Sequence, residues 1–397
     1  MSVTTEPALP PLAEERARAA ASLRERGIDF ALLSTPPNVT YASGFEAPLL
    51  LGPIVEIVGW IPPALALLAG ADGSGWLIVP DAYAAGAQAG SWLEHVESYG
   101  SLGHFEPVDP LASFCETLRS VLRAAGLAGS PAVLGVEPTL PALVQGLLEE
   151  EFPALELRDA SPALEAARWT KTPREIELLR AAIRVADAAQ NRLRELAVTA
   201  VGTSDVDVWT ELMRAMELQV GRHLIVTGEL VTGTRTSRIA PGGPVGRRID
   251  PGDAGLLDIS PRVDGYWADC TNVVVFGAEP SDEQRRYFAA ARESCEAAAD
   301  TLRPGARCSD AAEAVRVTLE RHGFPVAHYT GHQLGTSVNE RPRLATYDDS
   351  IVEPGMVFAI EPGVYAGEGG TVGARAEKVV LVTERGPELL SRFEWGI

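Results

Sequence analysis

Basic residues are scarce in this sequence. The chain of 397 residues contains 34 Lys and Arg against 54 Asp and Glu, which gives a formal net charge of −20. Such an acidic chain repels phosphate backbones, and no basic stripe in the sequence overrides that repulsion. The composition therefore argues against nucleic acid as a partner.

Cysteine is also scarce, and the four cysteines form no Cys-x-x-Cys pair: Cys115, Cys270, Cys295 and Cys308. Their wide spacing predicts neither a disulfide framework nor a zinc knuckle, and it fits a reducing compartment. The N-terminal residues contain no apolar segment of the kind that signal peptides carry. We therefore expect the protein in the cytoplasm.

Long uninterrupted hydrophobic runs are absent as well. The most apolar stretch, residues 49–68, contains Glu56 and is broken by two proline-containing turns. It is too interrupted for a membrane-spanning helix. We expect no membrane partner, and we predict buried strands in this stretch.

The length and the order of sequence patterns predict two domains. Helical and strand-like stretches alternate up to about residue 160, which is typical of an α/β domain. Later strand-like runs are arranged as hairpins between helices, which predicts an α+β domain. We place the two domains at residues 1–165 and 166–397.

Turn and capping signals place several elements of the first domain. A helical pattern follows Pro10-Pro11 and ends at Gly27. A strand-like run then leads to Pro36-Pro37-Asn38, which predicts a turn. The apolar runs at 63–70 and 76–80, separated by a polar break, predict a strand pair.

Capping signals also place helices in the second domain. Thr172 is a good N-cap, Pro173 suits the first helical position, and Glu175 completes a capping box. The same logic predicts a helix from Ser281. A further helix is predicted from Ser309 to about residue 322.

Two aspartates flank a predicted hairpin at Val263-Asp264-Gly265. If the turn centres between Val263 and Asp264, Asp258 faces Asp269 directly, with Cβ atoms roughly 5 Å apart. A turn shifted by one residue makes the two aspartates diagonal neighbours on the same face. Two carboxylates so placed repel each other unless a cation lies between them. The pair predicts a divalent metal site, although a plain polar surface would also account for it.

Three further residues fit a metal site. His332 follows His328 in a glycine-flanked stretch, and Glu361 ends an apolar run, where an unpaired carboxylate is costly to bury. Glu377 lies just inside another apolar strand, two residues after Arg375. Four carboxylates and one imidazole suit Mn, Co, Fe or Zn in a catalytic site better than a structural zinc.

The order of these residues resembles the pita-bread metallopeptidases, which include methionine aminopeptidase, aminopeptidase P, prolidase and the creatinase relatives. The matching motifs are Asp-x10-Asp, His in G-H-x-x-G, Glu in I-E-P-G and Glu in R-x-E. The segments GIDFALLSTPPNVTYASGF and RWTKTPREIELLR resemble the creatinase-type N-terminal domain and its linker. The resemblance implies an α/β creatinase-type domain followed by an α+β pita-bread catalytic domain, as in prolidase and aminopeptidase P.

The resemblance also implies two divalent metal ions, with Mn as the first choice and Co, Fe or Zn as alternatives. Asp258 would chelate one ion, and Asp269 and Glu377 would bridge both. His332 and Glu361 would bind the other ion. A hydroxide between the ions would attack the scissile carbonyl.

Further roles follow from the same resemblance. Glu361 would take the proton of the attacking water and deliver it to the leaving nitrogen. His328 would contact the substrate and stabilise the oxyanion, and Arg375 would orient Glu377. Asn339 and Tyr365 are candidates for substrate binding or for support of the ligands. Relatives of this kind are homodimers, so we expect a homodimer.

Two histidines that are usual in the family are missing. The position seven residues after His332 is Asn339, which can form hydrogen bonds but cannot carry a proton at neutral pH. A second family histidine lies roughly 17 residues before the first metal aspartate. No histidine occurs between His223 and His322, and the corresponding stretch is near Ala240.

Three functions remain open. The first is an Xaa-Pro dipeptidase or aminopeptidase that acts on small peptides, which we expect from the complete set of ligands. The second is a hydrolase or lyase of the creatinase or ectoine hydrolase type, acting on a C–N bond of a small polar metabolite, as the missing histidines suggest. The third is a non-catalytic binding protein with the same fold.

Overall fold

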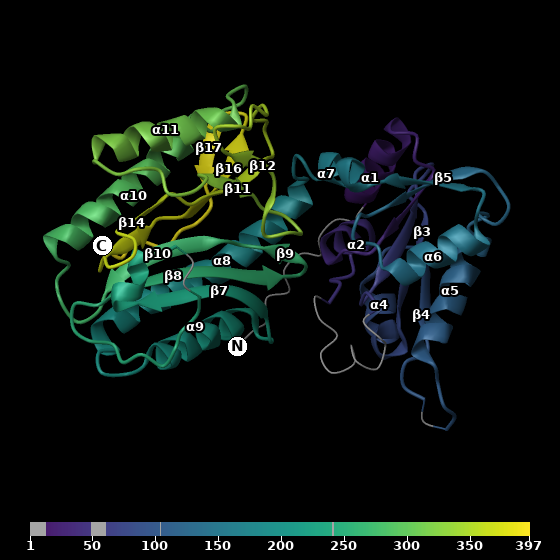
Figure 1. Ribbon diagram of the computed structural model, residues 1–397, viewed down its shortest axis with the longest axis horizontal. Coiled ribbons are helices and arrows are strands. Elements are labelled where there is room, and N and C mark those ends of the chain that lie inside the picture. Colours follow the sequence, from purple (N-terminus) through teal and green to yellow (C-terminus); the bar gives the residue numbers. More distant parts are fainter. Residues whose placement is uncertain (1–12, 49–60, 104, 240–241) are drawn as a thin grey trace, which may run out of the picture. The chain divides into compact units, whose positions relative to one another are not determined.

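The computed structural model describes residues 13–48, 61–103, 105–239 and 242–397. The chain divides into two compact units, Met1–Arg168 and Trp169–Ile397 (Figure 1). No helix in the described part of the chain is long and apolar enough to cross a lipid bilayer.

The first unit is built on a six-stranded sheet with the order β4-β3-β2-β1-β5-β6. Strands β1 and β5, β5 and β6, and β3 and β4 are parallel, while β2 is antiparallel to both of its neighbours. The strands are β1 (Phe30–Leu33), β2 (Leu65–Ala69), β3 (Gly75–Pro80), β4 (His95–Tyr99), β5 (Ala132–Val136) and β6 (Leu155–Asp159).

Helices cover both faces of this sheet, so β1 is apolar throughout. Ala31 and Leu33 point into one buried cluster, and Leu32 points into the other. This alternation is what a strand with two buried faces requires. The helices are α1 (Ala13–Glu25), α2 (Pro36–Ser43), α4 (Ala84–Gly90), α5 (Pro110–Ala124), α6 (Ala142–Glu151) and α7 (Ser161–Ala167), with the 3₁₀ helix η1 (Asp81–Tyr83).

The predicted turn at Pro36-Pro37-Asn38 is wrong, because helix α2 begins at Pro36. Proline is compatible with the first turn of a helix, where its missing N–H has no intrahelical partner to lose. Gly44 then ends the helix in the left-handed conformation at φ 69°. Of the strands predicted over 49–68, β2 includes 65–68, and residues 49–60 lie outside the described part.

The second unit consists of antiparallel sheets and long helices. Strands β10, β8 and β7 form one sheet, with β9 added to β8, and a second sheet has the order β12-β11-β13-β16-β17. Strands β14 and β15 form a separate ribbon. The strands are β7 (Ile225–Thr232), β8 (Ala254–Val263), β9 (Tyr266–Trp267), β10 (Cys270–Val275), β11 (Gly331–Gln333), β12 (Glu340–Leu344), β13 (Val357–Ile360), β14 (Gly363–Tyr365), β15 (Gly373–Arg375), β16 (Lys378–Thr383) and β17 (Gly386–Leu389).

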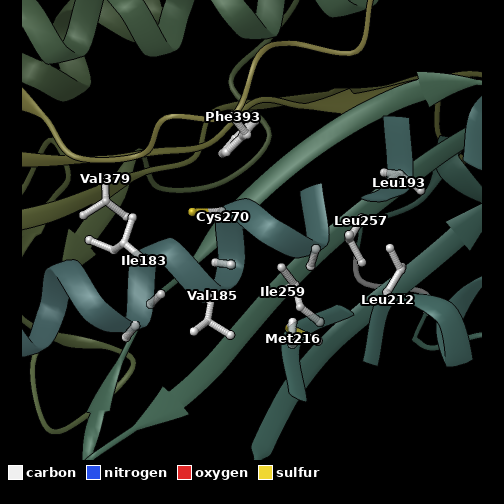
Figure 2. Close-up of a cluster of buried hydrophobic side chains, with 14 of the residues drawn as sticks. Ile183, Val185, Leu193, Leu212, Met216, Leu257, Ile259, Cys270, Val379 and Phe393 are labelled. Atoms are coloured by element: carbon white, nitrogen blue, oxygen red, sulfur yellow. The ribbon is translucent and has the colours of Figure 1, made fainter. Parts of the chain in front are cut away.

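Four α-helices in the described part of this unit pack against the sheets. The cluster of buried side chains in Figure 2 joins α8 and α9 to strands of both sheets, with Leu257 and Ile259 from β8 and Val379 from β16. A second cluster packs α10 and α11 against β13 and β16. The helices are α8 (Pro173–Thr199), α9 (Asp205–Val220), α10 (Asp282–Thr301) and α11 (Cys308–Arg321), with the 3₁₀ helix η2 (Gly233–Ser237).

Two of the three predicted helix starts are confirmed, and the third differs by one residue. Thr172 and Ser281 are N-caps, each in a complete capping box. The third helix begins at Cys308 with Arg307 as its N-cap, so the predicted start at Ser309 is one residue late. Fold class is confirmed for both halves of the chain: α/β in the first and α+β with hairpins in the second.

The cap of α8 gives a test of this fold. The Thr172 hydroxyl accepts a hydrogen bond from the Glu175 N–H at 3.1 Å, and both side chains are buried. We expect Thr172→Ala to lower the free energy of unfolding by about 1–2 kcal/mol, because an orphan N–H is left in the interior. Urea denaturation of the full chain measures this change. Thr172→Ser keeps the hydroxyl oxygen, so its free energy of unfolding should fall clearly less. Equal decreases for the two variants would contradict a capping role.

Candidate metal centre

The hairpin between β8 and β9 decides how the two aspartates meet. Val263 pairs with Tyr266, and the two-residue turn at Asp264-Gly265 has φ angles of 48° and 85°. Both positions of such a turn need positive φ, which Asp and Gly tolerate and a β-branched residue such as Val263 does not. The turn therefore centres one residue later than direct pairing of the aspartates would require.

The same register continues into β10, where Asp258 pairs with Thr271. Asp269 lies two residues before Thr271, so the two aspartates are diagonal neighbours on one face. Of the two predicted arrangements, the diagonal one is correct and the directly opposed one is wrong.

The other three predicted ligands come from the five-stranded sheet. His332 lies in the middle of β11 and pairs with Ala359 of β13. Glu361 directly follows β13, and its backbone N–H donates to the Thr330 carbonyl at 2.8 Å. Glu377 directly precedes β16 rather than lying inside it, and its N–H donates to the carbonyl of Thr271 at 3.0 Å.

These elements bring the side chains into one cluster. The Nε2 atom of His332 lies 3.7 Å from Asp269 Oδ2 and 3.4 Å from Glu361 Oε1. Asp269, His332 and Glu377 each offer a ligand atom within 4.8 Å of the others. The charge of Asp258 acts on both Asp269 and Glu377.

The tautomer of His332 bears on what this cluster can hold. Its Nδ1 lies 3.0 Å from the Gln333 carbonyl oxygen, so Nδ1 carries a proton and donates it. In the neutral ring, Nε2 then presents a lone pair toward two carboxylates. Acceptors that face one another in this way are repulsive until a cation lies between them.

The carboxylates point to the same conclusion. Burial raises the pKa of Asp269 well above its usual range, and the charges of Glu377, Asp258 and Glu361 raise it further. Burial likewise raises the pKa of Glu377, with further contributions from Glu361 and Asp258. Glu377 Oε1 is buried without a hydrogen-bond partner among the residues that the structure describes. An oxygen-rich, electron-rich set of this kind fits divalent metal ions.

Arg375 is the cation that the protein itself supplies, and it is buried beside the cluster. Its Nε donates to Thr271 Oγ1 at 3.2 Å, and Thr271 Oγ1 donates to Glu377 Oε2 at 2.7 Å. Arg375 therefore reaches Glu377 through Thr271. Arg375 Nη2 also donates a hydrogen bond directly to Asp258.

Two more groups bind Arg375. Glu229 of β7 accepts a hydrogen bond from Arg375 Nη2 at 2.9 Å, and the Tyr365 hydroxyl accepts one from Arg375 Nη1 at 3.2 Å. The Tyr365 hydroxyl is also 3.3 Å from His328 Nε2. Because His328 Nδ1 donates to the Tyr329 carbonyl at 2.9 Å, Nε2 of the neutral ring accepts from Tyr365.

Asn339, the position at which the family resemblance led us to expect a histidine, contacts Tyr329. Its Nδ2 donates to the Tyr329 hydroxyl at 2.9 Å. Ala240, near which the second histidine is missing, lies outside the described residues.

Several residues of the centre were missed from the sequence. Ser260 Oγ donates to Asp269 Oδ1 at 2.8 Å, and Glu229 pairs with Asp258 across β7 and β8. The correct hairpin register would have placed Ser260 opposite Asp269. No signal in the sequence pairs β7 with β8, so the position of Glu229 opposite Asp258 could not be predicted. Tyr329 was also missed, because nothing in the sequence places it near Glu361.

Comparison with known proteins supports the same family for both halves of the chain. Residues 177–384 match the profile of metallopeptidase family M24, and residues 16–169 match that of the creatinase/prolidase N-terminal domain. An Xaa-Pro dipeptidase of Pyrococcus furiosus is 25% identical over 93% of this chain and 95% of its own length. A probable dipeptidase of Mycobacterium tuberculosis is 30% identical over 67% of this chain and 69% of its own length.

Solved structures show the same fold. The prolidase of Pyrococcus horikoshii is similar with a TM-score of 0.76 and 24% identity, covering 96% of this chain and 99% of its own. An X-Pro aminopeptidase of Thermotoga maritima has a TM-score of 0.79 and 22% identity, covering 96% and 98%. With the two profile matches, these likenesses confirm the predicted combination of domains. The chain is an enzyme that belongs to metallopeptidase family M24 and carries a creatinase/prolidase N-terminal domain.

Proposed function

We propose that this peptidase is a metal-dependent enzyme that hydrolyses the Xaa-Pro bond of small peptides, as a dipeptidase or an aminopeptidase. The observation that carries the chemistry is the cluster in which His332 Nε2 lies 3.7 Å from Asp269 and 3.4 Å from Glu361, with Asp269, His332 and Glu377 able to share one metal ion. The substrate class is supported by the relatives, of which several are named Xaa-Pro dipeptidase.

Two divalent ions would be held by the five-residue cluster: Asp258, Asp269, His332, Glu361 and Glu377. Its oxygen-rich composition favours Mn, with Co, Fe or Zn as alternatives. When bound, such ions polarise the scissile carbonyl and make water a stronger nucleophile at neutral pH. The carboxylates bring the negative charge that two dications require.

Glu361 would move the proton during hydrolysis. It follows β13, its backbone is fixed by the bond to Thr330, and its carboxylate is only partly exposed. Water adds its oxygen to the carbonyl carbon while its proton passes to a Glu361 oxygen. The same proton then passes to the leaving nitrogen as the C–N bond breaks, so the products are a carboxylate and the free amine of proline.

His328 and Tyr365 would face the substrate carbonyl. In the neutral form described above, His328 Nε2 is an acceptor, so it can stabilise an oxyanion only after gaining a second proton there. In that form the single proton of the Tyr365 hydroxyl is donated to His328 Nε2, so Tyr365 is not a free donor either. Once His328 carries a proton at Nε2, the Tyr365 hydroxyl could donate to the oxyanion as well.

A second candidate is hydrolysis or lyase cleavage of a C–N bond in a small polar metabolite. It is favoured by Asn339, since an amide bound to Tyr329 cannot exchange protons with a substrate as a histidine can. Under either activity, we propose that residues 166–397 form the catalytic domain and residues 1–165 the N-terminal domain. We further propose that the enzyme is a cytoplasmic homodimer.

Metal analysis joined to a substrate panel tests the proposed function. We expect two divalent ions per chain, and release of proline from Xaa-Pro dipeptides or of the N-terminal residue from longer Xaa-Pro peptides. Chelation should abolish turnover and Mn should restore it, because the ions supply the activated water. The panel should include Xaa-Ala peptides and cyclic or guanidino metabolites. Turnover of a metabolite alone would establish the second candidate; no proline release with Mn or Co loaded would refute the first.

The raised pKa values of Asp269 and Glu377 predict how pH affects the metal-free protein. The folded state keeps these protons above the pH at which an unfolded chain releases them, so it binds more protons and its stability falls as pH rises. We expect the melting temperature of chelator-treated protein to fall as pH rises above about 4, the ordinary pKa of a carboxyl in an unfolded chain. Stabilisation by added Mn should grow over the same range, because metal replaces protons. Glu377→Gln should flatten the pH dependence; an unchanged slope would argue against these protons.

Ser260 allows a test of the ligand set itself. Ser260→Ala removes the hydrogen bond to Asp269 while keeping the strand, and we expect about tenfold weaker Mn binding. Isothermal titration calorimetry on the full chain measures the change. Ser260→Thr keeps a hydroxyl and should lose less affinity. If both variants bind Mn as the parent does, Asp269 is not held through Ser260.

A further inference from the structure

Glu229 is a buried carboxylate beside the metal centre that the proposed mechanism does not use. It lies on β7 opposite Asp258 of β8, so the two side chains share one face of the sheet. Glu229 Oε1 accepts a hydrogen bond from Arg375 Nη2 at 2.9 Å, and Oε2 accepts one from the Gly242 N–H at 3.1 Å. The donors are a guanidinium and a backbone amide, so the direction of both hydrogen bonds is fixed.

Arg375 Nη2 lies between the two facing carboxyl groups. It donates to Glu229 and also to Asp258. Carboxyl groups that face each other across two strands need a donor between them, and the two N–H groups of Nη2 supply one to each. Asp258 is therefore held by an arginine that Glu229 holds in turn.

The remaining N–H groups of Arg375 are directed to other partners. Nη1 donates to the Tyr365 hydroxyl and Nε to Thr271 Oγ1, each at 3.2 Å. Because Arg375 is buried, water does not readily replace a partner that is lost. Without the Glu229 oxygen, one N–H of Nη2 would be left unpaired, and a turn of the guanidinium to satisfy it would move the N–H that Asp258 uses.

The second oxygen of Glu229 reaches the loop of residues 242–247. Asp205, the first residue of α9, supports the same loop from a fully buried position and accepts hydrogen bonds from two of its backbone N–H groups at 2.8 Å and 3.0 Å. Within the described part of the chain, no hydrogen bond or ion pair joins Asp205 to Arg375. Glu229 thus links the loop to Arg375, whereas Asp205 supports the loop alone.

We propose that Glu229 is a positioning residue of the metal centre, which holds Arg375 in the orientation that fixes Asp258 and ties the 242–247 loop to that arginine. This inference rests on the proposed function for the role of Asp258 as a metal ligand. A turn of the Asp258 carboxylate would change the geometry offered to the metal, so the partner that prevents this turn affects metal affinity. Glu229 acts through Arg375 rather than as a sixth ligand, because both of its oxygens face donors of the protein.

Two simpler roles for Glu229 give different results. It would supply only negative charge that attracts a dication, or it would only anchor the loop. Glu229→Asp keeps the charge, but its side chain is one methylene shorter and cannot keep both hydrogen bonds. Asp205→Asn weakens the support of the same loop without altering a hydrogen bond of Arg375.

The experiment compares Glu229→Gln, Glu229→Asp and Asp205→Asn in the full chain, with Mn affinity measured by calorimetry and kcat and KM on the best peptide of the panel. We expect both Glu229 variants to bind Mn about tenfold more weakly and to lower kcat about tenfold, with KM little changed. Asp205→Asn should leave Mn affinity close to that of the parent. Parent-like Mn affinity in Glu229→Asp would assign the effect to charge, and an equal loss in Asp205→Asn would assign it to the loop. Either result overturns the proposal, as does parent-like behaviour of Glu229→Gln.

Arg375→Met tests the path through the arginine. In that background there is no guanidinium for Glu229 to position, so Glu229→Gln should cost little further Mn affinity. Equal losses in the parent and Arg375→Met backgrounds would overturn the role through Arg375. Melting temperatures identify any variant that does not fold, and the comparison of Glu229→Asp with Asp205→Asn decides the proposal without the Arg375 variant.

Failure of the proposed function remains distinguishable. A parent protein that binds Mn but cleaves no Xaa-Pro peptide refutes that function, while the Mn affinities of the Glu229 variants still decide the role of Glu229. A parent that cleaves Xaa-Pro peptides, with Glu229 variants that match it in Mn affinity and kcat, refutes the positioning role alone.

Discussion

Repulsion among buried carboxylates is the constraint on which the second unit depends. Asp269, Glu377 and His332 each offer a ligand atom within 4.8 Å of the others, and Glu377 and His332 are buried. Burial and the charges of the neighbouring carboxylates raise the pKa of both Asp269 and Glu377. The surrounding fold must therefore offset the free-energy cost of burying these carboxyl groups together.

The fold meets this demand by dividing the ligands between two sheets that share one core. The hydrophobic cluster of α8 and α9 fixes β8 and β16 against each other (Figure 2), and with them Asp258 in β8 and Glu377 directly before β16. Arg375 supplies positive charge where the two sheets meet, and it reaches Glu377 through Thr271. Arg375 neutralises only part of the negative charge of these carboxylates, and metal ions would neutralise the rest.

The departures from the family pattern concern proton transfer rather than ligand number. Asn339 donates a hydrogen bond to the Tyr329 hydroxyl. An amide carries no proton that it could exchange at neutral pH, so Asn339 itself cannot act as an acid or a base.

The sequence by itself determined the helix caps at Thr172 and Ser281 and the Asp-Gly hairpin, because each depends on chemistry within a few neighbouring residues. It also singled out the five candidate metal ligands. It left two registers open for Asp258 and Asp269, although the positive φ demanded at both turn positions would have chosen between them. The turn predicted at Pro36 failed because proline suits both a turn and a helix start. Only the tertiary structure decided which side chains hold the ligands. Ser260 contacts Asp269, and Glu229 contacts Arg375, across strands that meet through packing of the shared core, and no local pattern in the chain predicts those contacts.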